Sequence, residues 1–192
     1  MTMTTLTPPP ALAQIQADTV ALGFPMASEP EVGALLRTLA ASKPGGVVLE
    51  LGTGTGLATA WLLDGMDADA HLITVDNDPA VAAIARRHLA SDSRVQFHVM
   101  DAADLLPTLA GESVDLLFAD TWAGKYTQFD AALHLLKPGG LYVIDDMLPQ
   151  PNWPAGHAVK VAHLLADLTA RTDLVLTQLA WASGVIIATK RS

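Results

Sequence analysis

The sequence contains no cysteine, so neither disulfides nor thiolate metal sites can contribute to this protein. Basic residues are also few: 11 Lys and Arg stand against 20 Asp and Glu, which gives a formal net charge of -9. Such a charge repels a phosphate backbone and argues against nucleic acid as a partner. Residues 1–10 contain no basic residue before an apolar run, and no stretch reaches the roughly 18 apolar residues of a membrane span. These absences predict a cytoplasmic protein without a secretory signal or membrane contact.

What remains is a chain of 192 residues, 51% hydrophobic and 16% charged, which is enough for one well-buried core. We expect an N-terminal helical extension over residues 1–42 that packs on a core of residues 43–192. Within the extension, residues 11–22 and 31–41 carry apolar side chains at helical spacing. The turn-rich residues 23–30 between them either fold over a site or merely connect the two helices.

From Lys43 onward, short aliphatic runs alternate with helical stretches, a pattern typical of βαβ units with a parallel sheet. The last two runs are separated by only five residues, too few for a parallel crossover of about a dozen, and predict an antiparallel hairpin. We therefore predict a doubly wound α/β fold with a mostly parallel seven-stranded sheet and a reversed C-terminal strand. The expected strands are 47–51, 72–75, 95–100, 114–119, 141–144, 174–179 and 185–189. The expected helices of the core are 56–64, 79–90, 127–136 and 156–170, with a stop and turn at 137–140.

A glycine-rich turn, Glu50-Leu51-Gly52-Thr53-Gly54-Thr55-Gly56, joins the first strand to the next helix and is suited to a nucleotide-like cofactor. Its third fingerprint position is Leu57 where NAD and FAD proteins have Gly or Ala, which disfavours those cofactors. Acidic residues follow at the strand ends, the edge where open α/β sheets bind ligands. Each of them could instead cap a helix or close a turn. They are Glu50, Asp76, Asp101 and Asp120.

The run from Val47 to Trp61, the acids at the strand ends and the stretch from Phe118 to Tyr126 together resemble the small O-methyltransferases related to catechol and caffeoyl-coenzyme A O-methyltransferases. The resemblance covers roughly residues 26–192 and implies S-adenosyl-L-methionine as the cofactor. It implies that Glu50 and the turn hold the methionine part, that Asp76 holds the ribose and Asp101 and Ala102 the adenine, with Trp122 against the adenine ring. The predicted cofactor-binding residues are Met26, Glu50, Gly52, Thr53, Gly54, Asp76, Asn77, Asp101, Ala102, Asp120 and Trp122.

Methyl transfer to a hydroxyl needs an aligned acceptor and either a general base or a divalent cation that lowers the acceptor pKa. Asp120, Asp145 and Asp146 follow neighbouring strands and could converge on Mg²⁺, or on Ca²⁺ or Mn²⁺. The resemblance supports this assignment, although Asp146 stands where Asn is usual. The third carboxylate is compatible with tighter metal binding and equally with a site that has lost its metal.

The family's catalytic lysine has no counterpart, because its place is taken by Ala123. Lys125, two residues further on, is a candidate base, with a solvent-exposed surface lysine as the alternative. His157 is a second candidate base or substrate contact, because histidine titrates near neutral pH, and its alternative is a helix-start or surface histidine.

The predicted function is therefore O-methyl transfer to a small hydroxylated acceptor, for which an aromatic compound is one candidate. Two alternatives stay open: an NAD-dependent oxidoreductase, and a catalytically inactive S-adenosylmethionine-binding protein. The N-terminal helices and the final hairpin either form the surface of a homodimer or pack on their own sheet.

Overall fold

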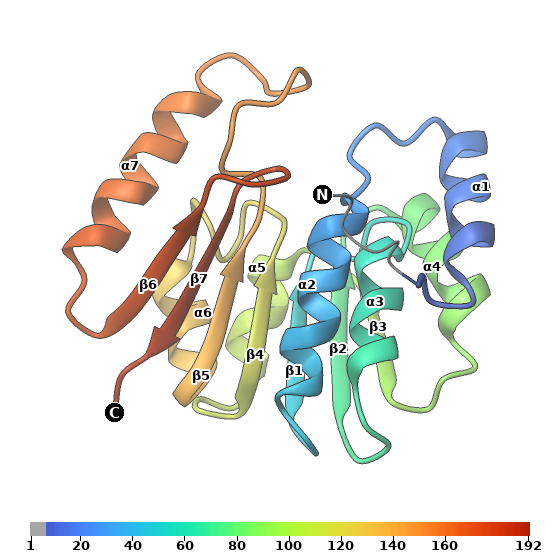
Figure 1. Cartoon of the computed structure of the whole chain (residues 1–192), viewed down its shortest axis with the longest axis horizontal. Coiled ribbons are helices and arrows are strands. Elements are labelled where there is room, and N and C mark those ends of the chain that lie inside the picture. Colours follow the sequence, from blue (N-terminus) through green and yellow to red (C-terminus); the bar gives the residue numbers. More distant parts are fainter. Residues whose placement is uncertain (1–6) are drawn as a thin grey trace, which may run out of the picture.

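The computed structural model describes residues 7–192. The predictions that concern residues 1–6 of the N-terminus lie outside the described residues. The described part forms one seven-stranded sheet between two layers of helices (Figure 1). Its strands are β1 (Val47–Leu51), β2 (His71–Asp76), β3 (Val95–Val99), β4 (Val114–Ala119), β5 (Leu136–Ile144), β6 (Leu174–Leu179) and β7 (Val185–Lys190). Its α-helices are α1 (Leu12–Leu22), α2 (Pro30–Ala41), α3 (Leu57–Gly65), α4 (Pro79–Leu89), α5 (Ala102–Leu105), α6 (Phe129–Leu135) and α7 (His157–Ala170), and a 3-10 turn follows α5 at Leu106–Thr108.

The strand order is β3-β2-β1-β4-β5-β7-β6, and the five strands from β3 to β5 pair in parallel. Strand β7 runs antiparallel to both β5 and β6, which confirms the predicted reversed C-terminal strand. No local pattern in the sequence predicts that this last strand inserts between β5 and β6. Helix α6 ends at Leu135, in agreement with the stop predicted at residues 137–140. These residues lie inside β5 and not before it, where they interrupt the register against β4, and Gly139 has a φ of +77°.

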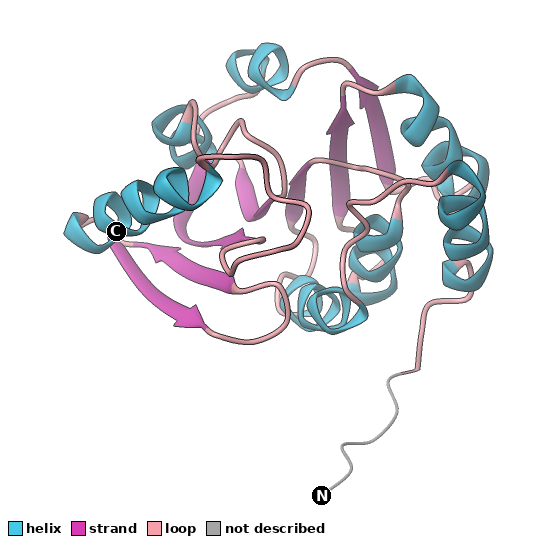
Figure 2. Ribbon diagram, turned by 90° about the horizontal axis from the view of Figure 1, so that it is seen from above, coloured by secondary structure: helices cyan, strands magenta, loops and turns pink. Residues whose placement is uncertain are grey.

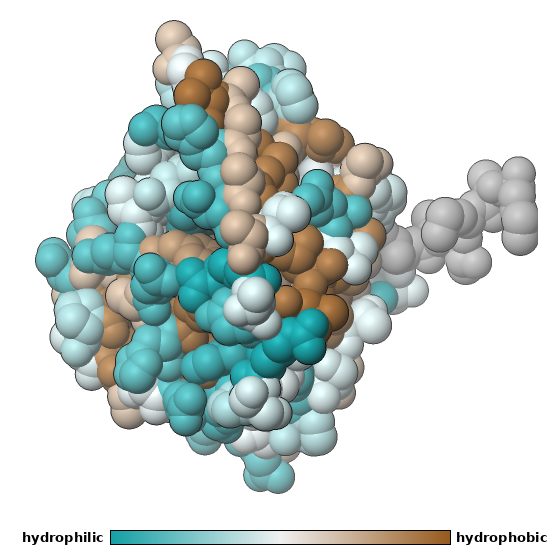
Figure 3. All heavy atoms as spheres, turned by 90° about the vertical axis from the view of Figure 1, so that its left-hand side faces the viewer, coloured by the Kyte–Doolittle hydropathy of each residue, from teal (hydrophilic) through white to brown (hydrophobic). Residues whose placement is uncertain are grey.

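Alternate residues of the central strands enter two separate cores, as expected for a sheet covered on both faces. Val48 of β1 packs with α1 to α4, whereas its neighbour Leu49 packs with α5 to α7. The N-terminal helices thus pack on their own chain, with α2 against α3 and α1 against α4. The face over α7 and β6 mixes hydrophobic and hydrophilic side chains, with Val159 and Val175 exposed (Figure 3). Between residues 7 and 192 there is no helix with the length and hydrophobicity to cross a membrane.

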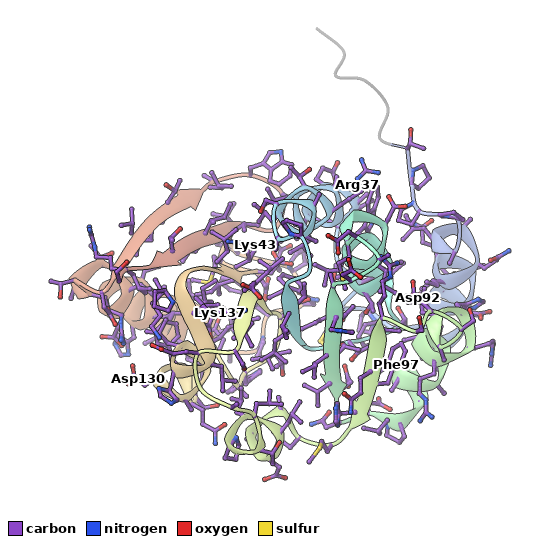
Figure 4. The ribbon with its side chains drawn as sticks, turned by 90° about the horizontal axis from the view of Figure 1, so that it is seen from below. Arg37, Lys43, Asp92, Phe97, Asp130 and Lys137 are labelled. Atoms are coloured by element: carbon purple, nitrogen blue, oxygen red, sulfur yellow. The ribbon has the colours of Figure 1, made fainter. Side chains whose placement is uncertain are left out.

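Several polar contacts lie at the amino ends of the central strands, which is the side of the sheet seen in Figure 4. The Lys137 ammonium lies 2.8 Å from Oδ2 of Asp115, which also accepts a hydrogen bond from the backbone N–H of Val47. The Lys43 ammonium donates to the carbonyl oxygen of Gly139. The opposite, carboxyl ends carry the long loops instead, which leaves that edge open for a site.

Gly33 in α2 packs directly on the indole of Trp61 in α3, and a Cβ at this glycine would lie 2.2 Å from the indole Cδ1. We expect Gly33→Ala to lower the free energy of unfolding by about 1–3 kcal/mol through overpacking, even though alanine favours helices over glycine by about 1 kcal/mol. Urea unfolding measures the change. The matched control is Glu31→Ala at an exposed position of the same helix, and a stabilised Gly33→Ala variant would contradict this packing.

Candidate active site

A cavity of about 950 Å³ opens at the carboxyl ends of the central strands, the edge that faces the viewer in Figure 2. Its floor consists of the glycine-rich turn after β1 and of the residues that directly follow β2, β4 and β5. Its outer wall consists of residues 24–29, before α2, and residues 150–154, before α7. The loops that contain these two segments pass over the sheet in Figure 2, and they are joined by a hydrogen bond from Asn152 Nδ2 to the Pro25 carbonyl oxygen at 3.3 Å.

The glycine-rich turn presents backbone to this cavity because two of its positions exclude larger residues. Gly52 has a φ of +106°, and a Cβ there would lie 2.8 Å from the carbonyl oxygen of Asp120. The Gly52 and Thr53 backbone N–H groups donate to the Val75 carbonyl oxygen, which fixes the turn to β2. Gly54 has a φ of +53°, and its N–H donates to Asp76 Oδ2 at 2.7 Å. The turn is therefore held rigid from both sides.

The acids at the ends of β2 and β3 line the cavity beside this turn, as predicted. Asp76 Oδ1 also accepts from the Asp78 backbone N–H at 2.9 Å, and Asp101 Oδ1 caps α5 through the Ala103 N–H at 2.8 Å. The capping alternative and the ligand-binding prediction are therefore compatible, because each carboxylate still faces the cavity. Asn77 and Ala102 line the same wall.

Glu50 lies behind the turn, outside the cavity lining, and is completely buried. Its Oε2 accepts hydrogen bonds of 2.6 Å from the hydroxyls of Thr59 and Thr74, while Oε1 has no partner. Thr53, which does line the cavity, has its hydroxyl 2.6 Å from that of Thr74. A chain of hydroxyls thus connects Glu50 to the cavity. Burial, only partly offset by the two hydroxyls, raises the pKa of Glu50 to about 7.

The three aspartates predicted to bind metal line one wall of the cavity, but each has another partner. Both carboxylate oxygens of Asp146 accept from the indole N–H of Trp153 at 2.8 Å. Asp145 accepts from the Ser183 hydroxyl, and Ser28 lies 3.4 Å from Asp120 Oδ2. Burial, reinforced by repulsion from Asp145, raises the pKa of Asp120 well above its ordinary value, and burial also raises that of Asp145.

This arrangement does not support the predicted metal site for Mg²⁺, Ca²⁺ or Mn²⁺. Within residues 7–192, no group of three or more His, Cys, Asp or Glu side chains is arranged to hold a metal ion. Asp146 has a φ of +60°, in the left-handed region, and both of its carboxylate oxygens accept from the indole N–H of Trp153. The residues present therefore do not fit a three-aspartate metal centre.

Lys125 is buried in the cavity wall, with 4% of its surface exposed, so the alternative of a surface lysine is wrong. Its loop is tightly wound, because the carbonyl oxygen of Trp122 accepts from the N–H groups of residues 125, 126 and 127. The buried Tyr142 hydroxyl of β5 donates to the Gly124 carbonyl oxygen and ties this loop to the sheet. Gly124 itself has a φ of +82°, with Leu51 and Tyr142 where a Cβ would project.

His157 is both the first residue of α7 and part of the cavity wall, 5% exposed. Its Nε2 lies 3.0 Å from the Tyr126 hydroxyl and 3.8 Å from Asp146 Oδ2. Its Nδ1 is buried without a partner, and burial lowers the pKa of the imidazole. The rings of Trp122, Tyr126 and Trp153 pack around it, and Trp122 remains about half exposed at the cavity.

Segment 24–29 covers the cavity, which answers the question that the sequence left open about residues 23–30. Met26 lines the cavity and is 63% exposed, so one face is free for a ligand. The sequence interpretation missed Ser28, Ser183 and the Glu50 partners Thr59 and Thr74. No motif marks a single serine or threonine, and only the fold brings these hydroxyls to the carboxylates.

The chain matches the methyltransferase domain family over residues 49–147. A protein named as an O-methyltransferase from Mycobacteroides abscessus is 39% identical over 174 residues, 84% of this chain and 80% of that protein. The catechol O-methyltransferase of Niastella koreensis is 35% identical, over 66% of this chain and 61% of that protein. Against several other mycobacterial relatives the matched region is 54% to 65% of their length. The O-methyltransferase TomG of Streptomyces achromogenes, solved with S-adenosylmethionine, superimposes with a TM-score of 0.83 at 26% identity, over 97% of this chain and 92% of TomG.

The family match and the likeness to a solved O-methyltransferase identify this fold and its cavity as those of a methyltransferase. The chain belongs to the methyltransferase domain family, and its relatives place it among the S-adenosylmethionine-dependent O-methyltransferases.

The buried Glu50 makes stability depend on pH. Because its folded pKa of about 7 exceeds the ordinary 4.5, the folded state binds more protons in this window, and stability falls as pH rises through it. The free energy of unfolding of the wild type should fall between pH 5 and pH 8. For Glu50→Gln, we expect this fall to be smaller by roughly 2 kcal/mol. Urea unfolding at both pH values measures this, with exposed Glu31→Gln as control. Parallel pH profiles for Glu50→Gln and wild type would refute the raised pKa.

Proposed function

We propose that this chain transfers the methyl group of S-adenosylmethionine to the hydroxyl oxygen of a small aromatic acceptor. The observation that carries the proposal is the wall formed by the glycine-rich turn with Asp76 and Asp101, all open to one cavity. In this assignment the turn holds the methionine part, Asp76 the ribose and Asp101 the adenine edge. Seven acids and one lysine line the cavity among the described residues, a charge balance that suits a cationic sulfonium.

The cavity has room for both reactants, since about 950 Å³ lies at the upper end of the usual range of ligand sites, about 300–1,000 Å³. The rings of Trp122, Tyr126 and Trp153 supply flat apolar surface for an aromatic acceptor. Segment 24–29 and residues 150–154 exclude water from the reacting atoms, while alignment of acceptor and methyl donor supplies much of the rate. The bound donor contributes a methyl group on a positively charged sulfur.

The acceptor hydroxyl must also lose its proton, and we assign to His157 the role of accepting that proton. Its neighbour Tyr126 lines the cavity and lies within hydrogen-bond distance of His157 Nε2, so a proton from the acceptor can reach the imidazole through the phenol oxygen. The lowered pKa leaves the imidazole neutral and able to accept a proton near pH 7. A His157→Gln variant that keeps the wild-type kcat would contradict this assignment.

The two alternative functions find less support. An NAD-dependent oxidoreductase disagrees with the relatives, which are named as methyltransferases. An inactive cofactor-binding protein is favoured by Ala123 in place of the family's lysine, together with Asp146 in place of the usual Asn among the three predicted metal ligands. A cytoplasmic location and a homodimer remain predictions.

The cofactor assignment is tested by ligand binding. We expect S-adenosylmethionine and S-adenosylhomocysteine to raise the Tm while NAD does not. Asp76→Ala should weaken S-adenosylhomocysteine binding by at least about 10-fold, since hydrogen bonds to charged groups contribute about 1.5–3 kcal/mol. Isothermal titration calorimetry measures the Kd. The control is Asp104→Ala, an exposed acid of α5 outside the cavity lining.

The transfer itself is tested with radiolabelled S-adenosylmethionine and a panel of phenols and catechols. Label in an extracted methyl ether supports O-methyl transfer. Stabilisation by NAD alone would contradict the cofactor assignment, and cofactor binding without turnover on the whole panel would favour the inactive cofactor-binding protein.

A further inference from the structure

The wall that carries Asp120, Asp145 and Asp146 already contains a positive charge. Lys125 is the one lysine or arginine among the described residues that line the cavity. Its ammonium lies near enough to Asp120 and Asp145 to act against the rise in the pKa of both carboxyl groups. It also lies 5.5 Å from the centre of the Tyr126 ring. A cation is therefore part of the folded chain at the edge where a metal was predicted.

The position of this ammonium is fixed by the fold. The Lys125 loop is wound around the Trp122 carbonyl oxygen and tied to β5 by the Tyr142 hydroxyl. With 4% of its surface exposed, the side chain is enclosed in the cavity wall. A buried lysine carries a desolvation cost, which the neighbouring carboxylates offset.

Two of the three carboxylates also have donors within the chain. Trp153 donates to both oxygens of Asp146, and Ser183 donates to Asp145. A divalent ion between the aspartates would share these carboxylates with their donors and would experience repulsion from the ammonium of Lys125.

We propose that the Lys125 ammonium takes the place of a divalent cation in this site and makes methyl transfer by this chain independent of metal. The proposal rests on the proposed function. The fixed positive charge stabilises the acceptor oxygen as it loses its proton, and thereby lowers the pKa of the hydroxyl group. The O–H proton passes to His157 and the oxygen forms the bond to the methyl carbon. The carbon–sulfur bond breaks with its electron pair on sulfur, so S-adenosylhomocysteine leaves neutral at that atom.

Two variants distinguish a role of Lys125 as a fixed charge from a role as a general base. Lys125→Arg keeps a positive charge but cannot accept a proton near neutral pH, whereas Lys125→Met removes the charge and keeps most of the length. The matched control is Lys160→Met, which removes the lysine that lies over the outer face of Trp122 and is absent from the cavity lining.

The first measurement is thermal unfolding of each protein with MgCl2 or MnCl2, which does not depend on turnover. We expect no shift in Tm for wild type, Lys125→Arg or Lys160→Met. Lys125→Met should gain a rise in Tm with Mn²⁺, because its carboxylates have lost their internal counter-charge. A metal-induced rise in wild type, or its absence in a folded Lys125→Met, would overturn the proposal even if no acceptor is found.

The second measurement is turnover with and without EDTA. Wild type should keep its kcat in EDTA, Lys125→Arg should stay within about 10-fold of it, and Lys125→Met should lose at least about 100-fold. Loss of wild-type activity in EDTA with recovery on Mg²⁺ would overturn metal independence. A folded Lys125→Arg as inactive as Lys125→Met would identify Lys125 as the base and overturn its role as a fixed charge. Absence of turnover in wild type would instead count against the proposed function, leaving the unfolding measurement to decide the role of Lys125.

Discussion

Negative charge concentrated at one edge of the sheet is the constraint on which the rest of this structure depends. Four carboxylates lie at or just beyond the ends of three neighbouring parallel strands, namely Glu50, Asp120, Asp145 and Asp146. Glu50 and Asp145 are buried, and burial also acts on Asp120. Burial deprives these carboxylates of water, and repulsion from neighbouring carboxylates adds to it, which raises the pKa values of Glu50, Asp120 and Asp145. The fold offsets this cost with donors from elsewhere in the chain. They are Thr59, Thr74, Trp153, Ser183 and the ammonium of Lys125.

The same charges prepare the cavity for its chemistry. Acids beside the glycine-rich turn suit a sulfonium, while the single positive charge of Lys125 suits an oxygen that becomes anionic as it reacts. Trp122, Tyr126 and Trp153 supply aromatic surface at the cavity. Carboxylates alone would disfavour an anionic acceptor, so a cation is required at this wall, and in this chain the cation belongs to a side chain. The charges that suit the reactants are therefore the same charges that lower the stability of the folded chain at this edge of the sheet.

Much of the fold could be predicted from the sequence, because aliphatic strands, helical spacing and the short link before Val185 are local signals. The prediction did not foresee that residues 137–140 lie within β5 as an irregularity without partners on β4, or that β7 inserts between β5 and β6. The glycine-rich turn and Asp76 could be assigned because each follows a strand directly. The burial of Lys125 could not, since it depends on Gly124 and on a hydroxyl from β5. Nor could the contact between the Asp146 carboxylate and the indole of Trp153, two residues that lie seven positions apart without a motif between them.

The most direct test of this account is a crystal structure of the protein grown with S-adenosylhomocysteine and MnCl2, with anomalous diffraction data to locate manganese. The account predicts S-adenosylhomocysteine on the glycine-rich turn, its ribose at Asp76, no anomalous peak among Asp120, Asp145 and Asp146, and the Lys125 ammonium still in the cavity wall. A manganese peak bound by these aspartates, with Lys125 displaced into solvent, would contradict it.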